Sequence, residues 1–339
     1  MFLLKKFKIV FIITAIVFTG SFAIKLYNIH RFQHEEMTSF MMDTFVTIRA
    51  DGPSAQAKKA VKDATDRMQE IDKKMNALNP ESPVYAFNEK GVPIEDPEIV
   101  GLVQKGLEVS KISEGAFDMT LLPLSKLWGF DTKSPHLPAD REIKEALAKT
   151  GYKYLIVKDG KVNKIKPYIT LDFGGIAKGY AVGEALGVLR KEGITSGLID
   201  AGGDIYALGK RTDGKPWKVA IKAPREEGFK DGLLGYLELS DISIATSGDY
   251  ERFFIKDGKR YHHIFDSTTG YPANGGLMSA SIIYGDCTMT DVWTKVLFIL
   301  GPEKGLKIVE AVPGLGAIMV TTEGKILYSK NLKNEINKI

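Results

Sequence analysis

The chain has 339 residues, and 44% of them are apolar, which excludes an intrinsically disordered protein because so much apolar surface can form a core. The 46 basic and 42 acidic residues leave a net charge of only +4, spread along the chain, which argues against a nucleic-acid-binding protein, where Lys and Arg cluster. The single cysteine, Cys287, excludes an internal disulfide framework.

The first predicted element is an apolar segment at the N-terminus. Lys5, Lys6 and Lys8 precede an uncharged run over residues 9–24, which is the layout of an export signal. The run is intermediate in length between a cleavable signal peptide and a bilayer-spanning helix, and no convincing small-x-small cleavage site is present. We therefore expect residues 1–30 to anchor the protein in the cell membrane, with secretion after cleavage as the alternative.

A strand and two helices are expected next. Apolar and polar residues alternate over residues 42–50, which predicts a strand. Apolar residues at helical spacing then predict a helix that is capped by Ser54 and continues to Leu78. After a polar loop, a second helix is expected from Asp96 to Ser113, and Gly115 can end it by adopting the left-handed conformation.

The middle of the chain begins with short elements. Residues 140–149 form a predicted helix, and residues 154–165 form a predicted hairpin with an Asp-Gly turn at position 159. A buried strand is then expected to end at Asp172, followed by two glycines and a helix that starts at Ile176.

Short strands and two further helices make up the rest. Strands are expected within residues 195–209, 215–224, 232–239, 242–248, 251–266, 277–285, 316–322 and 325–329, and helices over residues 288–300 and 302–309. Runs of strands interrupted by helix pairs indicate an α+β fold with antiparallel or mixed sheets and packed helices. No linker, charge block or repeat interrupts residues 36–339, so these residues are expected to form one catalytic domain.

The first stretch with candidate chemistry is LDFGGIAKGYAVG, which begins at residue 171. Its spacing fits neither a P-loop nor a dinucleotide-binding G-x-G-x-x-G motif. Adjacent glycines admit a ligand close to the backbone, and the N–H groups of the helix start favour a phosphate. Lys178 would add positive charge, and Asp172 could accept hydrogen bonds from a sugar or base or position a metal. The alternative is a tight strand-helix junction with a solvated lysine.

Two further stretches follow. In RYHHIFDSTTGYP, His263 could act as a base or donor beside Asp266, although the Asp could instead form an ordinary Asx turn. In CTMTDVWTKVLFILG, Asp291 in the first turn of an apolar helix and Thr294 one turn later could face a hard cation. The alternative for Asp291 is a partner of the helix dipole.

Together and in this order, the stretches resemble the FAD:protein FMN transferases, the ApbE family. The resemblance runs from about Met42 to the C-terminus and rests on five ordered blocks: MMDTFVTI, GAFDMTLLPLSKLWGF, LDFGGIAKGYAVG, HHIFDSTTGYPA and TDVWTKVLFILG. It implies an extracytoplasmic enzyme that binds FAD with Mg²⁺ and attaches FMN through a phosphoester to a Thr or Ser hydroxyl of an exported or membrane electron-transfer protein, with release of AMP.

The resemblance also implies roles for individual residues. His263 is implied as the acid-base or phosphate-contacting group, and Asp291 as a catalytic metal ligand, joined by the carbonyl of Gly175. The implied flavin-nucleotide contacts are Met42, Leu78, Ala116, Phe117, Asp118, Thr120, Asp172, Lys178 and Phe265. For Met42 and Phe117 the alternative is simple core packing.

The chain departs from the family pattern at the metal helix. The family usually has a threonine four residues after the metal aspartate, and this chain has Lys295 there, with Thr294 one place earlier. Either Thr294 replaces the usual ligand or Lys295 contributes its charge to phosphate directly. Smaller departures are M-D-T for the common M-G-T and Asp266-Ser267 for the usual Asp-Pro. Two other functions therefore stay open: an FAD pyrophosphatase that releases FMN and AMP, and a non-catalytic extracytoplasmic flavin-binding protein.

Overall fold

The structure is a computed structural model that describes residues 32–225, 230–332 and 337. The predicted membrane segment, residues 1–30, lies outside the described residues. Among the helices that are described, none has both the length and the apolar character needed to cross a bilayer.

An eight-stranded sheet forms the centre of the fold. Its strand order is β1-β2-β5-β6-β9-β12-β13-β14, and neighbouring strands pair antiparallel throughout. The α+β fold with antiparallel sheets is therefore confirmed. The strands are β1 (Phe32–Met41), β2 (Thr44–Pro53), β5 (Ser196–Ala201), β6 (Asp204–Leu208), β9 (Ile242–Gly248), β12 (Leu277–Tyr284), β13 (Gly316–Thr321) and β14 (Ile326–Tyr328).

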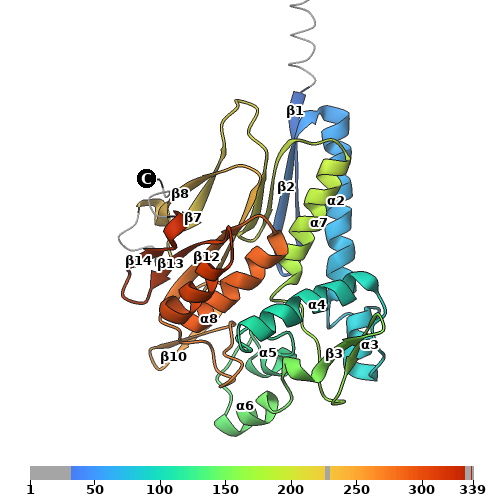
Figure 1. Ribbon diagram of the computed structural model, residues 1–339, viewed down its shortest axis with the longest axis vertical. Coiled ribbons are helices and arrows are strands. Elements are labelled where there is room, and N and C mark those ends of the chain that lie inside the picture. Colours follow the sequence, from blue (N-terminus) through green and yellow to red (C-terminus); the bar gives the residue numbers. More distant parts are fainter. Residues whose placement is uncertain (1–31, 226–229, 333–336, 338–339) are drawn as a thin grey trace, which may run out of the picture.

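Helices cover one face of this sheet and a hairpin covers the other. The helices are α2 (Ser54–Met75), α7 (Ala177–Lys191) and α8 (Cys287–Ala311), and α7 packs against both of the others (Figure 1). The hairpin of β7 (Trp217–Lys222) and β8 (Leu233–Leu239) packs a second apolar cluster against the sheet. Burial from both sides explains why the first seven residues of β12 are all buried rather than alternating.

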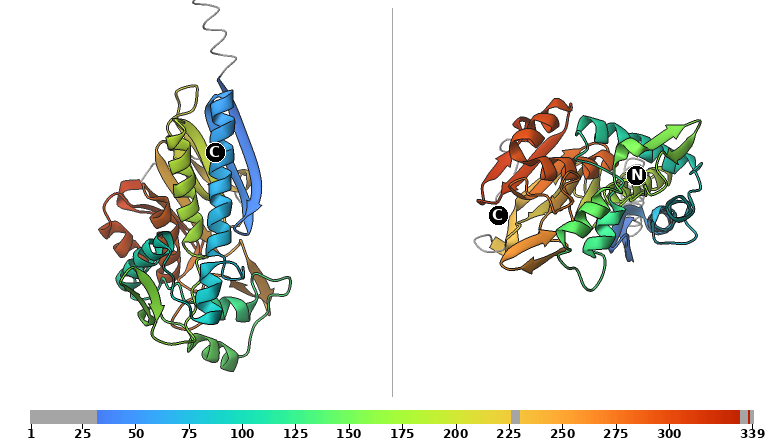
Figure 2. Two further views of the ribbon diagram at one scale, coloured as in Figure 1. Left: turned by 90° about the vertical axis from the view of Figure 1, so that its right-hand side faces the viewer. Right: turned by 90° about the horizontal axis from the view of Figure 1, so that it is seen from below.

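The smaller elements gather at the end of the molecule opposite the start of β1 (Figures 1 and 2). An aromatic cluster around Trp128 joins two of these helices to the β10–β11 hairpin. The elements are α3 (Pro83–Lys90), α4 (Pro97–Ile112), α5 (Leu122–Trp128), α6 (Asp140–Leu147), β3 (Leu155–Lys158), β4 (Lys161–Lys164), β10 (Phe253–Lys256) and β11 (Lys259–His262). Single 3-10 turns occur at Tyr152–Tyr154, Lys230–Gly232 and Lys330–Leu332.

Several local predictions are confirmed. The β3–β4 hairpin turns through two residues with positive φ, Asp159 at 52° and Gly160 at 71°. The predicted helix from Asp96 is present as α4, and Asp96 caps it by accepting hydrogen bonds from two backbone N–H groups. Gly115 has a φ of 91°, and its N–H closes the end of α4 by donating to the Ser110 carbonyl at 2.7 Å.

Other local predictions are wrong. The segment before Asp172 forms no strand, and Met42 lies in the β1–β2 turn with a φ of 52° instead of opening a strand. Ser54 does not cap α2, because its hydroxyl donates to Glu35 at 3.0 Å. The strand β1 and the helix α3 were not predicted. The residues of β1 are largely polar, and α3 lies in a stretch with several Asn and Pro residues, so neither shows a clear hydrophobic period.

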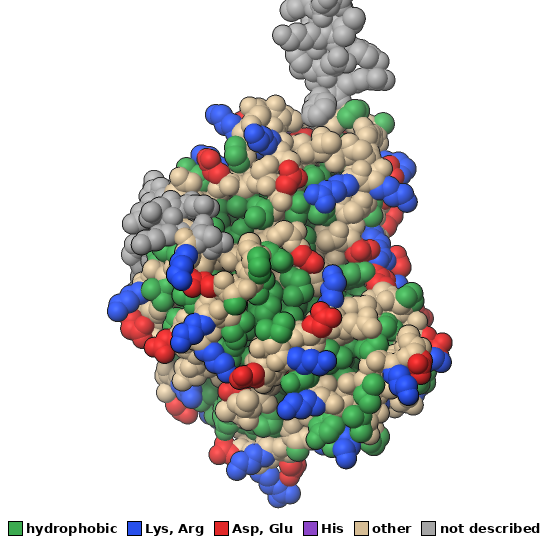
Figure 3. Space-filling model, viewed as in Figure 1, with side chains coloured by type: hydrophobic (Ala, Val, Ile, Leu, Met, Phe, Trp, Pro, Cys, Tyr) green, Lys and Arg blue, Asp and Glu red, His purple; other side chains and the backbone are tan. Residues whose placement is uncertain are grey.

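Charged side chains of both signs are interspersed on the face of the molecule shown in Figure 3, around a central apolar area. Lys and Arg do not gather there into a stripe of the kind that a nucleic acid backbone would need.

Candidate active site

The site begins where α7 crosses α8. A Cβ on Gly179 would lie 2.5 Å from the Cβ of Asp291 and would also clash with the carbonyl oxygen of Cys287, so only glycine allows this approach. The Gly179 N–H donates to Asp291 Oδ2 at 3.0 Å. Asp291 was predicted to lie in the first turn of its helix. Because α8 begins at Cys287, Asp291 lies in the second turn instead, and this position makes a role as partner of the helix dipole weaker.

Lys295 pairs with the other oxygen of the Asp291 carboxylate. Its Nζ forms an ion pair with Asp291 Oδ1 from one turn later on α8, and the Asp291 side chain is completely buried. Burial lowers the pKa of Lys295 to about 7, and the nearby Lys178 and Arg252 act in the same direction while Asp204 opposes them. An anionic ligand would raise this pKa again and so favour the charged lysine.

Thr294 points away from the carboxylate that it was predicted to join. Its hydroxyl donates to the backbone carbonyl of Asp291 at 2.6 Å and shares a hydrogen bond of 2.7 Å with the hydroxyl of Ser247. The contact to Ser247 holds the fully buried Thr294 against β9.

A second ion pair lies beside the first. Lys178 Nζ is 3.2 Å from Asp204 Oδ2, at the turn between β5 and β6. Asp204 is buried, and within the described part of the chain neither of its carboxylate oxygens has a partner in hydrogen-bond geometry. Burial also raises the pKa of the neighbouring Asp200. The turn therefore holds two carboxylates close to Lys178.

Arg252 links this region to the glycine turn. Burial raises the pKa of Asp172, Asp131 acts in the same direction, and the charge of the nearby Arg252 opposes them. Arg252 forms an ion pair with Asp131 and also lowers the pKa of Lys295, so the two ends of the predicted site share this arginine as a neighbour. We refer to Lys178, Arg252 and Lys295 as the cation cluster.

The glycine turn offers fewer anion-binding N–H groups than predicted. Gly174 donates to Asp172 Oδ1 at 2.8 Å, and the N–H groups of Ile176 and Ala177 both donate to the Phe173 carbonyl. The Gly179 N–H, as described, is directed at Asp291. The positive charge of this site therefore comes mainly from side chains and less from the helix start.

His263 follows β11 directly and faces the same region. Its Nδ1 lies 3.3 Å from the Arg252 carbonyl, which can only accept, so Nδ1 carries the proton and Nε2 has the lone pair. Burial lowers the pKa of His263 well below its ordinary value, and Arg252 and His262 add to this effect. The expected carboxylate partner, Asp266, instead accepts from Thr268 in a local turn.

The loop from Ala116 to Thr120 is held by its own polar groups. Asp118 accepts hydrogen bonds from the backbone N–H groups of Thr120 and Tyr152, and the Thr120 hydroxyl accepts from Gly151 at 2.7 Å. The loop brings the buried Phe117 ring against Gly175, where an added Cβ would be 3.2 Å from the ring. In this geometry Asp118 and Thr120 brace the loop that positions Phe117 and the buried Ala116.

The three remaining predicted contacts differ in their surroundings. The turn that carries Met42 lies beside the β5–β6 turn, since a Cβ on Gly202 would be 3.0 Å from that of Thr44. Leu78 follows the end of α2 and is 63% exposed, whereas Phe265 is buried in the aromatic cluster around Trp128. The structure therefore brings Met42 close to the site, leaves Leu78 on the surface and gives Phe265 a packing role.

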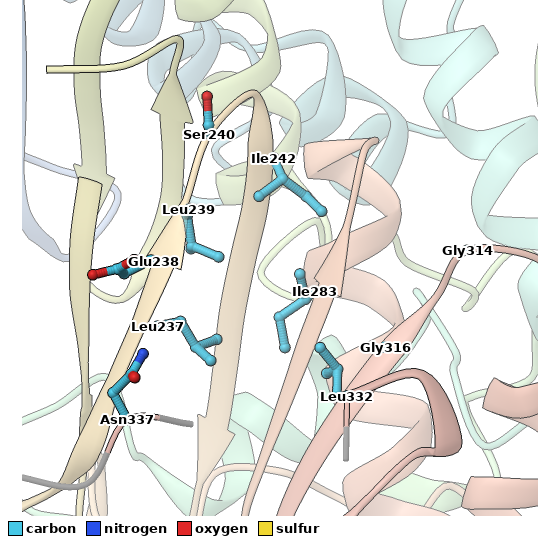
Figure 4. A pocket seen from close by; sticks show the side chains of 10 residues that line it. All are labelled: Leu237, Glu238, Leu239, Ser240, Ile242, Ile283, Gly314, Gly316, Leu332 and Asn337. Atoms are coloured by element: carbon cyan, nitrogen blue, oxygen red, sulfur yellow. The ribbon is translucent and has the colours of Figure 1, made fainter. Parts of the chain in front are cut away.

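A cavity of about 580 Å³ lies elsewhere, between β8 and the end of the sheet (Figure 4). The side chains of Leu237, Leu239, Ile242, Ile283 and Leu332 face into it, and none of the predicted site residues lines it. Among the described residues that line it there is no Lys or Arg for a diphosphate, so we interpret it as a gap between the hairpin and the sheet.

Two participants were missed by the sequence reasoning. Asp204 directly follows Gly202 and Gly203, a second pair of adjacent glycines like the pair in the first stretch. This repeated pattern is a sequence signal that could have identified Asp204. Arg252 carries no local signal, because its contact to Asp131 spans 121 positions.

Comparison with known proteins agrees with this arrangement. The ApbE family model matches residues 42–319. An FAD:protein FMN transferase of Vibrio cholerae is 30% identical over 84% of this chain and 87% of its own length, and one of Klebsiella pneumoniae is 34% identical over 72% and 75%. The crystal structure of the ApbE protein of Thermotoga maritima aligns with a TM-score of 0.82 at 32% identity, covering 90% of this chain and all of that chain. The Vibrio cholerae flavin transferase ApbE aligns with a TM-score of 0.80 at 28% identity and the same coverage. The chain is therefore a transferase and belongs to the ApbE family.

Proposed function

We propose that the protein is an FAD:protein FMN transferase that attaches FMN to a Thr or Ser hydroxyl of an acceptor flavoprotein. The observation that carries this proposal is the neutral His263, with its Nε2 lone pair, beside the cation cluster. A dinucleotide diphosphate is a dianion, and three cationic side chains around it stabilise the additional charge that develops on its oxygens during transfer.

The reaction balances with groups that this site contains. The acceptor hydroxyl oxygen forms a bond to the phosphorus of the FMN half, and the bond from that phosphorus to the bridging oxygen breaks, so that AMP leaves. His263 Nε2 is suited to receive the hydroxyl proton because Nδ1 already donates to the Arg252 carbonyl. Lys178, Arg252 and Lys295 orient the diphosphate and neutralise its charge.

Magnesium is implied by the resemblance, but the side chains do not fit it in this arrangement. Asp291 Oδ1 is paired with the Lys295 ammonium, and Oδ2 accepts from the Gly179 N–H. The Thr294 hydroxyl donates to a backbone carbonyl and does not face this carboxylate. A hard cation prefers several oxygen ligands that are free of competing cations, so we route no step through a metal.

The location is also part of the proposal: residues 1–30 hold an extracytoplasmic catalytic domain at the membrane, or are removed on secretion. The three lysines before the apolar run support it. In the described fold, Phe32 pairs with Pro53 and Ser196 with Asp51, so β1 starts near the C-terminal end of α7. The site lies at the other end of this 15-residue helix, about 22 Å from the start of β1. Mass spectrometry of the mature N-terminus tests whether the segment is retained.

One assay separates the proposed activity from its two alternatives. The full-length protein is incubated with FAD and a flavin-acceptor protein, and the products are separated on a denaturing gel viewed by flavin fluorescence. Transfer gives a fluorescent acceptor band that survives denaturation. Free FMN without a labelled acceptor would indicate a pyrophosphatase, and unchanged FAD would indicate a binding protein.

A further inference from the structure

Lys295 pairs with the carboxylate that the family resemblance implies as a metal ligand. Its ammonium pairs with one oxygen of the buried Asp291, on the same side of α8 and one turn away. The Lys295 side chain retains 17% exposure, whereas that of Asp291 has none. The other Asp291 oxygen accepts a hydrogen bond from the Gly179 N–H at 3.0 Å. Each oxygen of this carboxylate therefore already has one donor, Lys295 or Gly179.

The surroundings reinforce this arrangement. The charges of Lys178 and Arg252 both act to lower the pKa of Lys295, so a divalent ion placed at Asp291 would add to the positive charge already present there. The buried Asp204, which has no hydrogen bond within the described residues, balances part of this charge beside Lys178. An ammonium has three donors, and because one is used by Asp291, two remain for phosphate oxygens.

We propose that the Lys295 ammonium takes the place of the divalent cation at the FAD diphosphate, so that this protein binds and cleaves FAD without a metal ion. This inference rests on the proposed function, since it assumes that FAD is the ligand. Asp291 then acts as the counterion that positions Lys295, and Gly179 and Thr294 hold the helix that carries both residues.

The experiment compares the full-length wild type with Lys295→Thr, Lys295→Arg and a control, Lys304→Thr. Lys304 lies beyond the kink of α8 at Gly301 and pairs with Glu114 at the surface, so its replacement removes one charge and one ion pair outside the site. FAD affinity is measured from flavin fluorescence in EDTA and in Mg²⁺. Binding of Mn²⁺ to each FAD complex is measured by electron paramagnetic resonance, and transfer to the acceptor is followed in parallel.

The wild type and Lys304→Thr are expected to bind FAD equally well in EDTA and in Mg²⁺ and to hold no Mn²⁺. Lys295→Thr should lose about 10- to 100-fold in FAD affinity in EDTA, the fold-change expected for losing hydrogen bonds from a charged donor. Mg²⁺ should restore that affinity, and the variant should now bind Mn²⁺. Lys295→Arg keeps the charge and should keep most of the metal-independent affinity.

The inference is overturned if the wild type binds Mn²⁺ as tightly as Lys295→Thr, or if EDTA abolishes FAD binding by the wild type and Mg²⁺ restores it. A Lys295→Thr variant that does not fold leaves these two wild-type measurements to decide the question. If FAD binds but no acceptor is labelled under any condition, the proposed transfer fails, while the metal-free binding of FAD is still decided by affinity and Mn²⁺ signal.

Discussion

Replacement of Gly179 by alanine tests the helix crossing on which the site depends. Alanine at an exposed helical position gains about 0.5–1 kcal/mol over glycine. At Gly179 the new Cβ would meet the Asp291 Cβ at 2.5 Å and the backbone carbonyl of Cys287 even closer, and neither can move without shifting α8. Overpacking of this kind costs about 1–3 kcal/mol. Overpacking and the helix-propensity gain together give an expected net loss of about 1 kcal/mol in the free energy of unfolding.

The same helix provides two matched controls at four-residue spacing. A Cβ on Gly183 would lie 3.7 Å from the Cys287 Cβ, which is ordinary contact, and a Cβ on Gly187 would meet nothing within 4 Å. Both replacements should stabilise the protein by about 0.5–1 kcal/mol.

Urea unfolding of the full-length variants, followed by tryptophan fluorescence, measures these differences, and flavin transfer should fall about tenfold or more only in Gly179→Ala, because Asp291 is displaced. If Gly179→Ala were as stable and as active as Gly183→Ala, the described crossing of α7 and α8 would be incorrect.

Three further predictions concern single side chains. Asp291→Ala should abolish acceptor labelling because it removes the counterion that positions Lys295, and a labelling rate equal to that of the wild type would contradict this role. Because burial lowers the pKa of His263, the unfolded chain binds more protons between that lowered pKa and about 6.5, so the free energy of unfolding should fall as the pH falls below 6.5. This slope should be weaker in His263→Gln, and an unchanged slope in urea titrations would refute the assignment. Thr120→Val should cost about 1–3 kcal/mol by leaving the Gly151 N–H without its acceptor, and it should leave FAD affinity unchanged in the folded protein; selective loss of affinity would instead indicate a direct FAD contact.

Local sequence signals predicted those features whose causes are local. The Asp-Gly pair at position 159 has a conformational preference that dictates the turn, and Asp96 has a side chain of the right length to cap α4. The strand predicted before Asp172 was wrong because strand formation depends on pairing partners that the local sequence does not show. Its apolar residues are buried against neighbouring elements without joining a sheet, and apolar character alone cannot distinguish the two cases.

The site shows the same limit. The ordered blocks assign Asp172, Lys178, His263 and Asp291 to one site, and in the structure Arg252 affects the pKa of Asp172, His263 and Lys295, the last of which pairs with Asp291. They did not reveal that Lys295 pairs with Asp291, since the direction of a flexible side chain depends on its neighbours in space. The side chains of Asp118 and Thr120 were predicted to contact a ligand. In the structure they accept hydrogen bonds from backbone N–H groups and stabilise their own loop.

The most direct test of the account is intact mass spectrometry of an acceptor protein after incubation with FAD and the full-length enzyme. The account predicts that the acceptor gains the mass of FMN less one water, at a Thr or Ser, and that one AMP appears for each group attached. An acceptor of unchanged mass, with FAD either intact or hydrolysed to free FMN and AMP, would contradict the proposal that this site transfers flavin to a protein.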